Sequence, residues 1–157
     1  MKYFFLDTSA FVKAYVVEAG ERRVRGLVAG AVASPPSCRL IVTDFTFLEA
    51  ISALLQKRAE GKITKAACNS SLAEIEVLLK GVASPYLVIS TSDVSEDVPS
   101  IIRTYGLRPG DAVHVAAALA ARHSTPAGMQ FVFVTSDTNQ ANAARAEGFD
   151  VWDPAVD

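Results

Sequence analysis

The chain has 157 residues, half of them hydrophobic, and a formal net charge of −2 at pH 7. This length suits one sizeable hydrophobic core and is short for two, so we expect a single domain spanning residues 1–157. The charge excludes a basic field over the whole protein, so any contact with nucleic acid must come from a local basic patch.

Cysteine use and hydropathy indicate the compartment. Cys38 and Cys68 are the only cysteines, and neither has Cys or His partners at the spacing of a zinc site, which argues against a disulfide framework or a zinc protein. The first apolar run is interrupted by Asp7 after four residues, and no stretch approaches the ~20 apolar residues of a membrane span. We therefore expect a cytoplasmic protein without membrane contact.

The first predicted element is a strand whose end carries polar residues. Four apolar residues, Tyr3 to Leu6, lead directly into Asp7 and then into the hydroxyl residues Thr8 and Ser9. A continuous apolar run with aromatic residues is typical of a parallel-sheet strand covered on both faces. Because ligands of such sheets bind beyond the carboxyl ends of the strands, Asp7 is predicted to lie at a polar site.

The next fifty residues contain short elements bounded by Gly and Pro. They are a helix at 10–17 closed by Gly20, a helix at 21–28, a loop at 29–37, a strand at 40–42 and a helix at 45–55. The helix at 45–55 is apolar at nearly every position, more than a surface helix needs. This pattern predicts burial on more than one side, against the sheet and against a second subunit.

The second half continues the alternation of helices and strands. We expect a helix at 63–79 stopped by Gly81, a strand at 86–89, and a helix from the acidic region 92–97 to Tyr105. The next helix opens at 109–111 and has a small apolar body at 112–121. A loop at 124–129, a strand at 131–134, a helix at 141–147 and a strand at 150–152 follow. Five strands separated by helices predict an α/β domain with a mainly parallel sheet.

Four acids are candidates for one shared site. Asp7, Asp111 and Asp137 each stand at a strand end or a helix start, where Asp is also a preferred N-cap. Glu49 fits a capping box, but the apolar pattern already begins at Phe45, which leaves Glu49 inside its helix as a carboxylate that needs a partner. A shared cation accounts for all four acids, and oxygen donors without a His or Cys array favour Mg²⁺ or Mn²⁺.

The polar residues near these acids allow more than one interpretation. Thr8 and Thr135 fit helix caps and supports for the carboxylates equally well. His114, three residues after Asp111, is interpreted as a core histidine outside the chemistry. The three arginines at 22–25 form either a phosphate-facing patch or, better for most of them, a solvated helix face.

Four blocks of sequence resemble the PIN-domain nucleases, particularly the VapC-type toxins of bacterial and archaeal toxin–antitoxin pairs. The blocks stand in order across nearly the whole chain: residues 5–10 with Lys13 and Glu18 downstream, 47–50 with 52–54, 107–116, and 134–137 followed by 143–144 and 148–149. The resemblance implies a parallel sheet of order 3-2-1-4-5. It also implies that Asp7, Glu49, Asp111 and Asp137 bind Mg²⁺ or Mn²⁺, and that Thr135 supports the site.

The resemblance further implies a metal-dependent endoribonuclease that is the toxin of such a pair, binds a VapB-like antitoxin and forms a homodimer. Candidate contacts to the RNA backbone are Lys13, Arg22, Arg23, Arg25 and Arg108. Two alternatives stay open: a housekeeping PIN-domain nuclease that processes RNA, and a non-catalytic peptide-binding module whose acids are only caps. A phosphoacceptor signalling domain is disfavoured because no paired acids follow the first strand.

Overall fold

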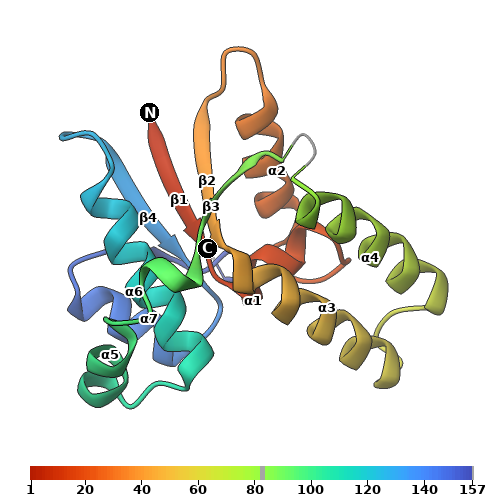
Figure 1. Cartoon of the computed structure of the whole chain (residues 1–157). Helices are drawn as coiled ribbons and strands as arrows, with labels where there is room; N and C mark the ends of the chain where they lie inside the picture. The colour runs from red at the N-terminus through yellow and green to blue at the C-terminus, as the bar shows by residue number, and fades with distance from the viewer. Residues whose placement is uncertain (82–83, 157) are drawn as a thin grey trace.

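The computed structural model describes residues 1–81 and 84–156. Five parallel strands form one sheet in the order β3-β2-β1-β4-β5, flanked by helices (Figure 1). The strands are β1 (Lys2–Leu6), β2 (Cys38–Thr43), β3 (Tyr86–Ile89), β4 (Gln130–Val134) and β5 (Asp150–Trp152). The predicted α/β class and the strand order 3-2-1-4-5 are thus confirmed. The domain bounds of 1–157 stay a prediction.

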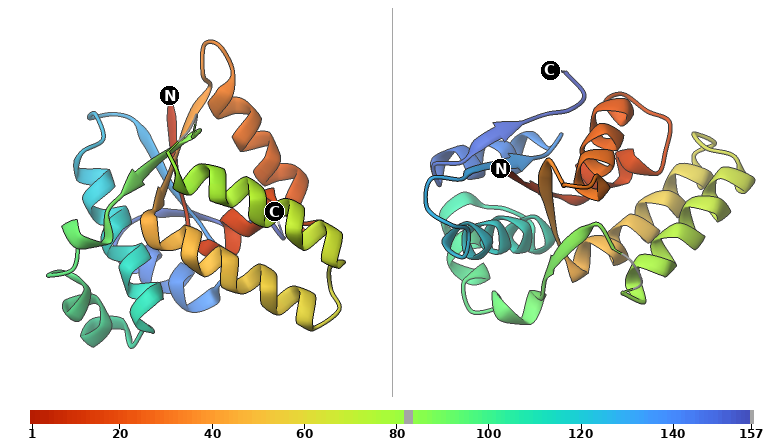
Figure 2. Two further views of the ribbon diagram at one scale, coloured as in Figure 1. Left: turned by 45° about the vertical axis from the view of Figure 1, so that its right-hand side comes forward. Right: turned by 90° about the horizontal axis from the view of Figure 1, so that it is seen from above.

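Helices connect successive strands. They are α1 (Thr8–Phe11), the 3₁₀ turn η1 (Val12–Ala14), α2 (Glu21–Val32), α3 (Asp44–Ala59), α4 (Lys65–Leu79), the 3₁₀ turn η2 (Thr91–Asp93), α5 (Val98–Tyr105), α6 (Pro109–His123) and α7 (Thr138–Ala146). Figure 2 shows α3 and α4 side by side, as a pair that extends away from the sheet.

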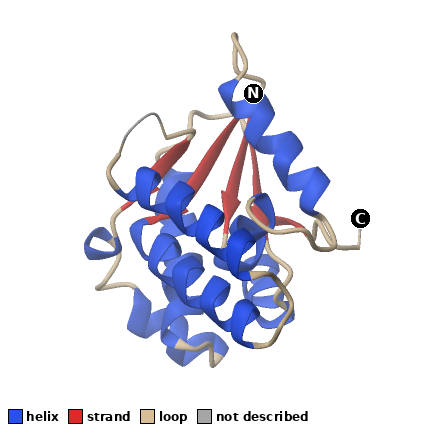
Figure 3. Ribbon diagram, turned by 90° about the vertical axis from the view of Figure 1, so that its right-hand side faces the viewer, coloured by secondary structure: helices blue, strands red, loops and turns tan. Residues whose placement is uncertain are grey.

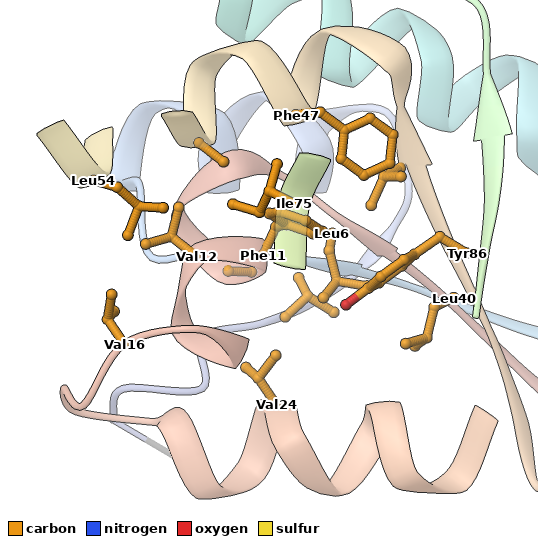
Figure 4. Packing of buried hydrophobic residues seen from close by; sticks show 14 of the residues in the cluster. Leu6, Phe11, Val12, Val16, Val24, Leu40, Phe47, Leu54, Ile75 and Tyr86 are labelled. Atoms are coloured by element: carbon orange, nitrogen blue, oxygen red, sulfur yellow. The ribbon is translucent and has the colours of Figure 1, made fainter. Parts of the chain in front are cut away.

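Alternating side chains on the strands divide the core into two clusters, one on each face of the sheet. Leu6 and Leu40 face the cluster formed with α1 to α4, which Figure 4 shows from close by. Phe5 and Phe133 stack at 5.4 Å between ring centroids on the other face, against α5, α6 and α7. The strands therefore run between two layers of helices (Figure 3).

The body of α6 forms the centre of the second layer. Its residues from Ala112 to Ala118 are all buried. The sequence predicted a central helix here because the residues are small and apolar nearly all round, which lets the helix pack closely against its neighbours. This prediction is confirmed.

The predicted loop at 29–37 was wrong for its first four residues, because α2 continues to Val32. Gly30 suggested a break, but it serves close packing inside the helix. A Cβ atom at Gly30 would lie 2.6 Å from Oγ of Ser37, and the backbone N–H of Ser37 donates to the Gly30 carbonyl at 2.9 Å. The returning chain therefore packs directly on the helix where a side chain is missing.

Helix α3 is buried on one side and not on several. Phe47, Ala50 and Leu54 are buried, whereas Leu48 is 56% exposed and Leu55 is 42% exposed. Within the described chain α3 is therefore buried on one side only, and the predicted burial of a second side depends on another subunit. Contact of α3 with a second subunit stays a prediction.

Cys38 and Cys68 are both free and buried. Across residues 1–81 and 84–156, no helix is both long enough and apolar enough to cross a membrane.

Candidate active site

Two of the predicted acids follow neighbouring strands. Asp7 comes directly after β1, and Asp137 stands three residues beyond the end of β4. Leu6 pairs with Val134 in the sheet, and the Asp7 N–H donates to the Val134 carbonyl at 3.2 Å. The chain leaves β1 for β2 on one side, while β4 lies on the other side. This is the kind of switch point at which parallel sheets bind ligands.

The other two acids are brought to the same edge by helices. Asp111 lies in the first turn of α6, and Glu49 lies in the second turn of α3. The two helices approach closely because Gly110 has no side chain: a Cβ atom there would lie 2.6 Å from Oε1 of Glu49. All four acids line one open pocket of about 720 Å³. The structure thus brings together all four residues that the sequence singled out.

Two of the four acids also cap helices. Oδ1 of Asp7 accepts from the N–H of Ala10 at 2.9 Å, and Oδ1 of Asp137 accepts from the N–H of Gln140 at 2.8 Å. Asp111 is different, because Arg108 occupies the N-cap position of α6. Capping therefore explains two positions and leaves unexplained why four acids face one pocket.

Asp7 is fully buried and heavily hydrogen-bonded. Ser9 Oγ donates to Oδ1 at 2.8 Å, and Thr135 Oγ1 donates to Oδ2 at 2.7 Å. Burial raises the pKa of the Asp7 carboxyl, and the nearby His114 and these hydrogen bonds reduce the shift without cancelling it. The ionised form of Asp7 is therefore disfavoured unless more positive charge is nearby.

Gln140 connects two of the acids, and the sequence analysis missed it. Its Nε2 donates to Oδ2 of Asp7 at 3.1 Å and to Oδ1 of Asp111 at 3.0 Å. Gln140 is 4% exposed, and its buried Oε1 has no hydrogen-bond partner within the described residues. The available indication was a Gln three residues after the Asp137 N-cap, as in a capping box, which places it in the first turn of α7.

His114 is the partner that Glu49 was expected to need. Nε2 of His114 lies 2.7 Å from Oε2 of Glu49 and 3.2 Å from Oγ1 of Thr8, and Thr8 also donates to Glu49. His114 is buried as predicted, and it also lines the pocket; its place outside the chemistry stays a prediction. The indication was its position one helical turn after Asp111, which puts both on one face of α6.

The pKa values of Asp111 and Glu49 are shifted in opposite directions. Burial raises the pKa of Asp111, and the charges of Asp137 and Glu49 raise it further against the opposing effects of His114 and Arg108. Burial also raises the pKa of Glu49, but hydrogen bonds from His114 and Thr8 outweigh it and leave that pKa below its ordinary value. Burial thus disfavours the ionised forms of both Asp7 and Asp111, and neighbouring negative charge adds to this effect only at Asp111.

The predicted RNA contacts separate into two groups. Lys13 and Arg108 line the pocket of acids, together with Lys57, which the sequence analysis did not single out. Arg22 and Arg23 line a second pocket, and Glu18 belongs to both pockets. Arg25 donates to the carbonyl of Ala14 at 3.1 Å. A contact of these three arginines with RNA stays a prediction.

The donor chemistry of the pocket fits a hard divalent cation, because carboxylate oxygens surround a region where two pKa values are raised. As the side chains stand, however, residues 1–81 and 84–156 contain no group of three or more Asp, Glu, His or Cys close enough to hold an ion. The Gln140 amide hydrogen-bonds Asp7 and Asp111 simultaneously. Binding of a cation by both acids would require this amide to move.

Residues 4–146 match the PIN domain family, so the chain belongs to that family. PIN domains are typically nucleases, a class of hydrolases. The four acids at the carboxyl edge of the sheet thus lie in a domain whose family members are typically nucleases. No curated protein sequence matches the chain.

Two solved structures share the fold at low sequence identity. A toxin–antitoxin complex from Klebsiella pneumoniae contains a chain that is 14% identical, with a TM-score of 0.57 and 96% of each chain covered. FitAcB from Neisseria gonorrhoeae contains a chain that is 17% identical, with a TM-score of 0.56 and coverage of 96% of this chain and 97% of the other. At these identities the similarity establishes the fold alone.

Proposed function

We propose that the protein is a metal-dependent endoribonuclease that hydrolyses phosphodiester bonds of RNA. The observation that carries this proposal is the meeting of four acids in one pocket of a PIN domain, two of them with raised pKa values. Mg²⁺ or Mn²⁺ would neutralise this charge through oxygen ligands. A non-catalytic peptide-binding module gives no reason for Asp111, which caps no helix, to face the same pocket.

The four acids, Asp7, Glu49, Asp111 and Asp137, are the proposed metal ligands. When bound, a divalent cation activates water for attack and neutralises charge on the phosphate and the leaving oxygen. The surrounding residues fix the carboxylates. Thr135, Ser9 and Gln140 orient Asp7, while Thr8 and His114 orient Glu49.

Single-stranded or looped RNA suits this pocket better than a duplex. The pocket is open and combines acids with the basic side chains of Lys13, Lys57 and Arg108. Exposed phosphates and unstacked bases are the parts of RNA that proteins contact most easily. Arg22 and Arg23, beyond Glu18, are proposed to contact the same strand farther from the acids.

The purified protein is expected to cut single-stranded RNA in Mg²⁺ or Mn²⁺ and to lose this activity in chelator, because the acids alone cannot neutralise the attacked phosphate. Gel analysis of an end-labelled RNA strand, its duplex and the matching DNA strand, each with metal and with chelator, is the measurement. It gives the metal requirement, the preference for a single strand over a duplex, and the preference for RNA over DNA. Equal cleavage in chelator would contradict the metal requirement. Equal cleavage of DNA would contradict the RNA preference.

We further propose that the protein is a cytoplasmic toxin of a type II toxin–antitoxin system, with a VapB-like antitoxin partner and a homodimeric state. The shared fold of a chain in a toxin–antitoxin complex supports this role. Exposed apolar side chains on the paired helices α3 and α4 offer a candidate surface for such partners. They are Leu48, Leu55, Val77 and Leu79. A housekeeping PIN-domain nuclease that processes RNA is the alternative.

Expression of the protein alone is expected to slow growth, and co-expression of a small adjacent reading frame is expected to restore it. Uncontrolled cleavage of cellular RNA is the physical cause, and growth curves with and without the second gene are the measurement. Normal growth with active enzyme in the lysate, and no adjacent small reading frame, would favour the processing role.

A further inference from the structure

One face of α3 forms a wall of the pocket that runs from the acids to a pair of lysines. Glu49, Ser52, Gln56 and Lys57 all line the pocket, and their spacing of three, four and one residues keeps them on neighbouring rows of the helix. With a rise of 1.5 Å per residue, Lys57 lies ~12 Å beyond Glu49 along the helix axis. Along this wall the pocket therefore runs from an acidic end at Glu49 to a basic end at Lys57.

At the basic end two ammonium groups bind one carboxylate. Nζ of Lys13, from η1, lies 3.2 Å from Oε1 of Glu18, and Nζ of Lys57 lies 2.5 Å from Oε2. The Lys13 side chain is only 9% exposed, unlike the usual solvated lysine. We call Lys13 and Lys57 the lysine site. With Glu18 bound, the lysine site carries one net positive charge.

Glu18 binds the lysine site in the way a phosphodiester would. Both groups carry one negative charge over two oxygens, and each Glu18 oxygen contacts one lysine. Glu18 also lines the second pocket, with Arg22 and Arg23, so basic side chains lie on that side of it as well. A purely structural ion pair would not require both lysines to line the same pocket as the four acids.

We propose that the lysine site binds a backbone phosphate of single-stranded RNA, and that Glu18 competes with this phosphate for the two lysines. The inference rests on the proposed function, because it assigns an RNA strand to the pocket. At about 3.4 Å per stacked nucleotide, ~12 Å corresponds to three or four nucleotides from the phosphate at the acids, and to fewer when the strand is extended. A stacked dinucleotide is then too short to occupy both ends.

The test compares RNA affinities in chelator, where the strand stays intact. Fluorescence anisotropy with labelled single-stranded RNA of eight and of two nucleotides gives Kd for the wild type, Glu18→Gln and Lys57→Met over a range of salt concentrations. The matched controls are Glu60→Gln and Lys62→Met, which change the same charges in an exposed ion pair outside the pocket.

Glu18→Gln is expected to bind the octanucleotide about 3- to 10-fold more tightly, because both lysines become free. The slope of log K against log salt should steepen by about 0.7, the value for one more phosphate contact on a single strand. Lys57→Met should weaken binding of the octanucleotide and flatten the slope by about the same amount. The dinucleotide also carries a phosphate that can occupy the lysine site, so both changes should shift its affinity in the same directions.

The inference is overturned if Glu18→Gln behaves like Glu60→Gln, or if Lys57→Met behaves like Lys62→Met. If Glu18→Gln does not fold, the comparison of Lys57→Met with Lys62→Met decides the question. If the wild type binds no octanucleotide even at low salt, the RNA substrate of the proposed function fails instead. The two failures are therefore distinguishable.

Discussion

Asp7→Asn is expected to lower the rate of RNA cleavage by roughly 10²–10³-fold, the range for loss of one electrostatic contribution to the transition state. Asp7 is the most deeply buried of the four acids and contacts the supports Ser9, Thr135 and Gln140. The substitution removes the charge that would hold the cation. It keeps the shape, and Asn caps a helix about as well as Asp.

Single-turnover cleavage in saturating Mn²⁺, together with thermal unfolding, is the measurement for this variant. Asp153→Asn is the matched control, because Asp153 accepts hydrogen bonds from Ser136 at 2.6 Å and from the N–H of Ala155 at 2.9 Å, and lies outside the pocket lining. Cleavage by Asp7→Asn within a few-fold of wild type would rule out Asp7 as a ligand. A comparable loss in the control would indicate a general effect on the fold.

The elements of the fold were predictable because parallel strands buried on both faces have continuous apolar sequences. The apolar runs before Asp7 and at 131–134 became the adjacent central strands β1 and β4. The order of the strands came from the family resemblance, since apolar runs alone do not say which strands are neighbours. Loop boundaries were less predictable, because Gly30 marks a close contact with Ser37 and no break in the helix.

The meeting of the acids was predictable for a geometric reason. Carboxyl ends of parallel strands share one edge of the sheet, so Asp7 and Asp137 had to lie near each other once β1 and β4 were neighbours. Glu49 could be included because a carboxylate inside an apolar helix needs a partner. The identity of that partner, His114, depended on the packing of α6 against α3.

Side-chain direction was the part that the sequence did not determine. Gln140 resembled an ordinary residue of a helix start, yet its amide reaches two carboxylates. Arg23 belongs to a basic cluster in the sequence, but its side chain donates to the carbonyl of Pro154 at 3.2 Å. Lys57 lies two turns after Glu49 on α3, and the sequence did not show that both side chains line one pocket.

Asp111→Asn is expected to raise the midpoint of thermal unfolding in chelator at pH 7. The pKa of Asp111 is raised in the folded protein, by burial first and then by the charge of Asp137. The stability linked to a raised pKa is fully present below the unfolded value, about 3.8, and is lost as the pH rises through the folded value. At pH 7 the wild type therefore carries the whole cost of an ionised Asp111, and the variant does not.

The substitution preserves the local hydrogen bond, because the amide oxygen of asparagine can still accept from Nε2 of Gln140. Asp44→Asn is a control of opposite sign. Burial raises the pKa of Asp44, but hydrogen bonds from Thr91 and Ser90 outweigh it and lower that pKa overall. Asp44 therefore stabilises the folded protein at pH 7, and its replacement should lower the midpoint.

The measurement is the midpoint of thermal unfolding of the wild type and both variants, in chelator and in Mn²⁺, from pH 4 to pH 7. A change of about 1 kcal/mol moves the midpoint by about 2–4 °C in a chain of this size. In chelator, the difference in unfolding midpoint between Asp111→Asn and the wild type should shrink as the pH approaches 4. At 100-fold over Kd, Mn²⁺ should stabilise the wild type by about 2.7 kcal/mol, and Asp111→Asn clearly less. If Asp111→Asn is no more stable than the wild type in chelator and gains as much from Mn²⁺, Asp111 is not a ligand, and the proposed cation site would be reduced to the other three acids.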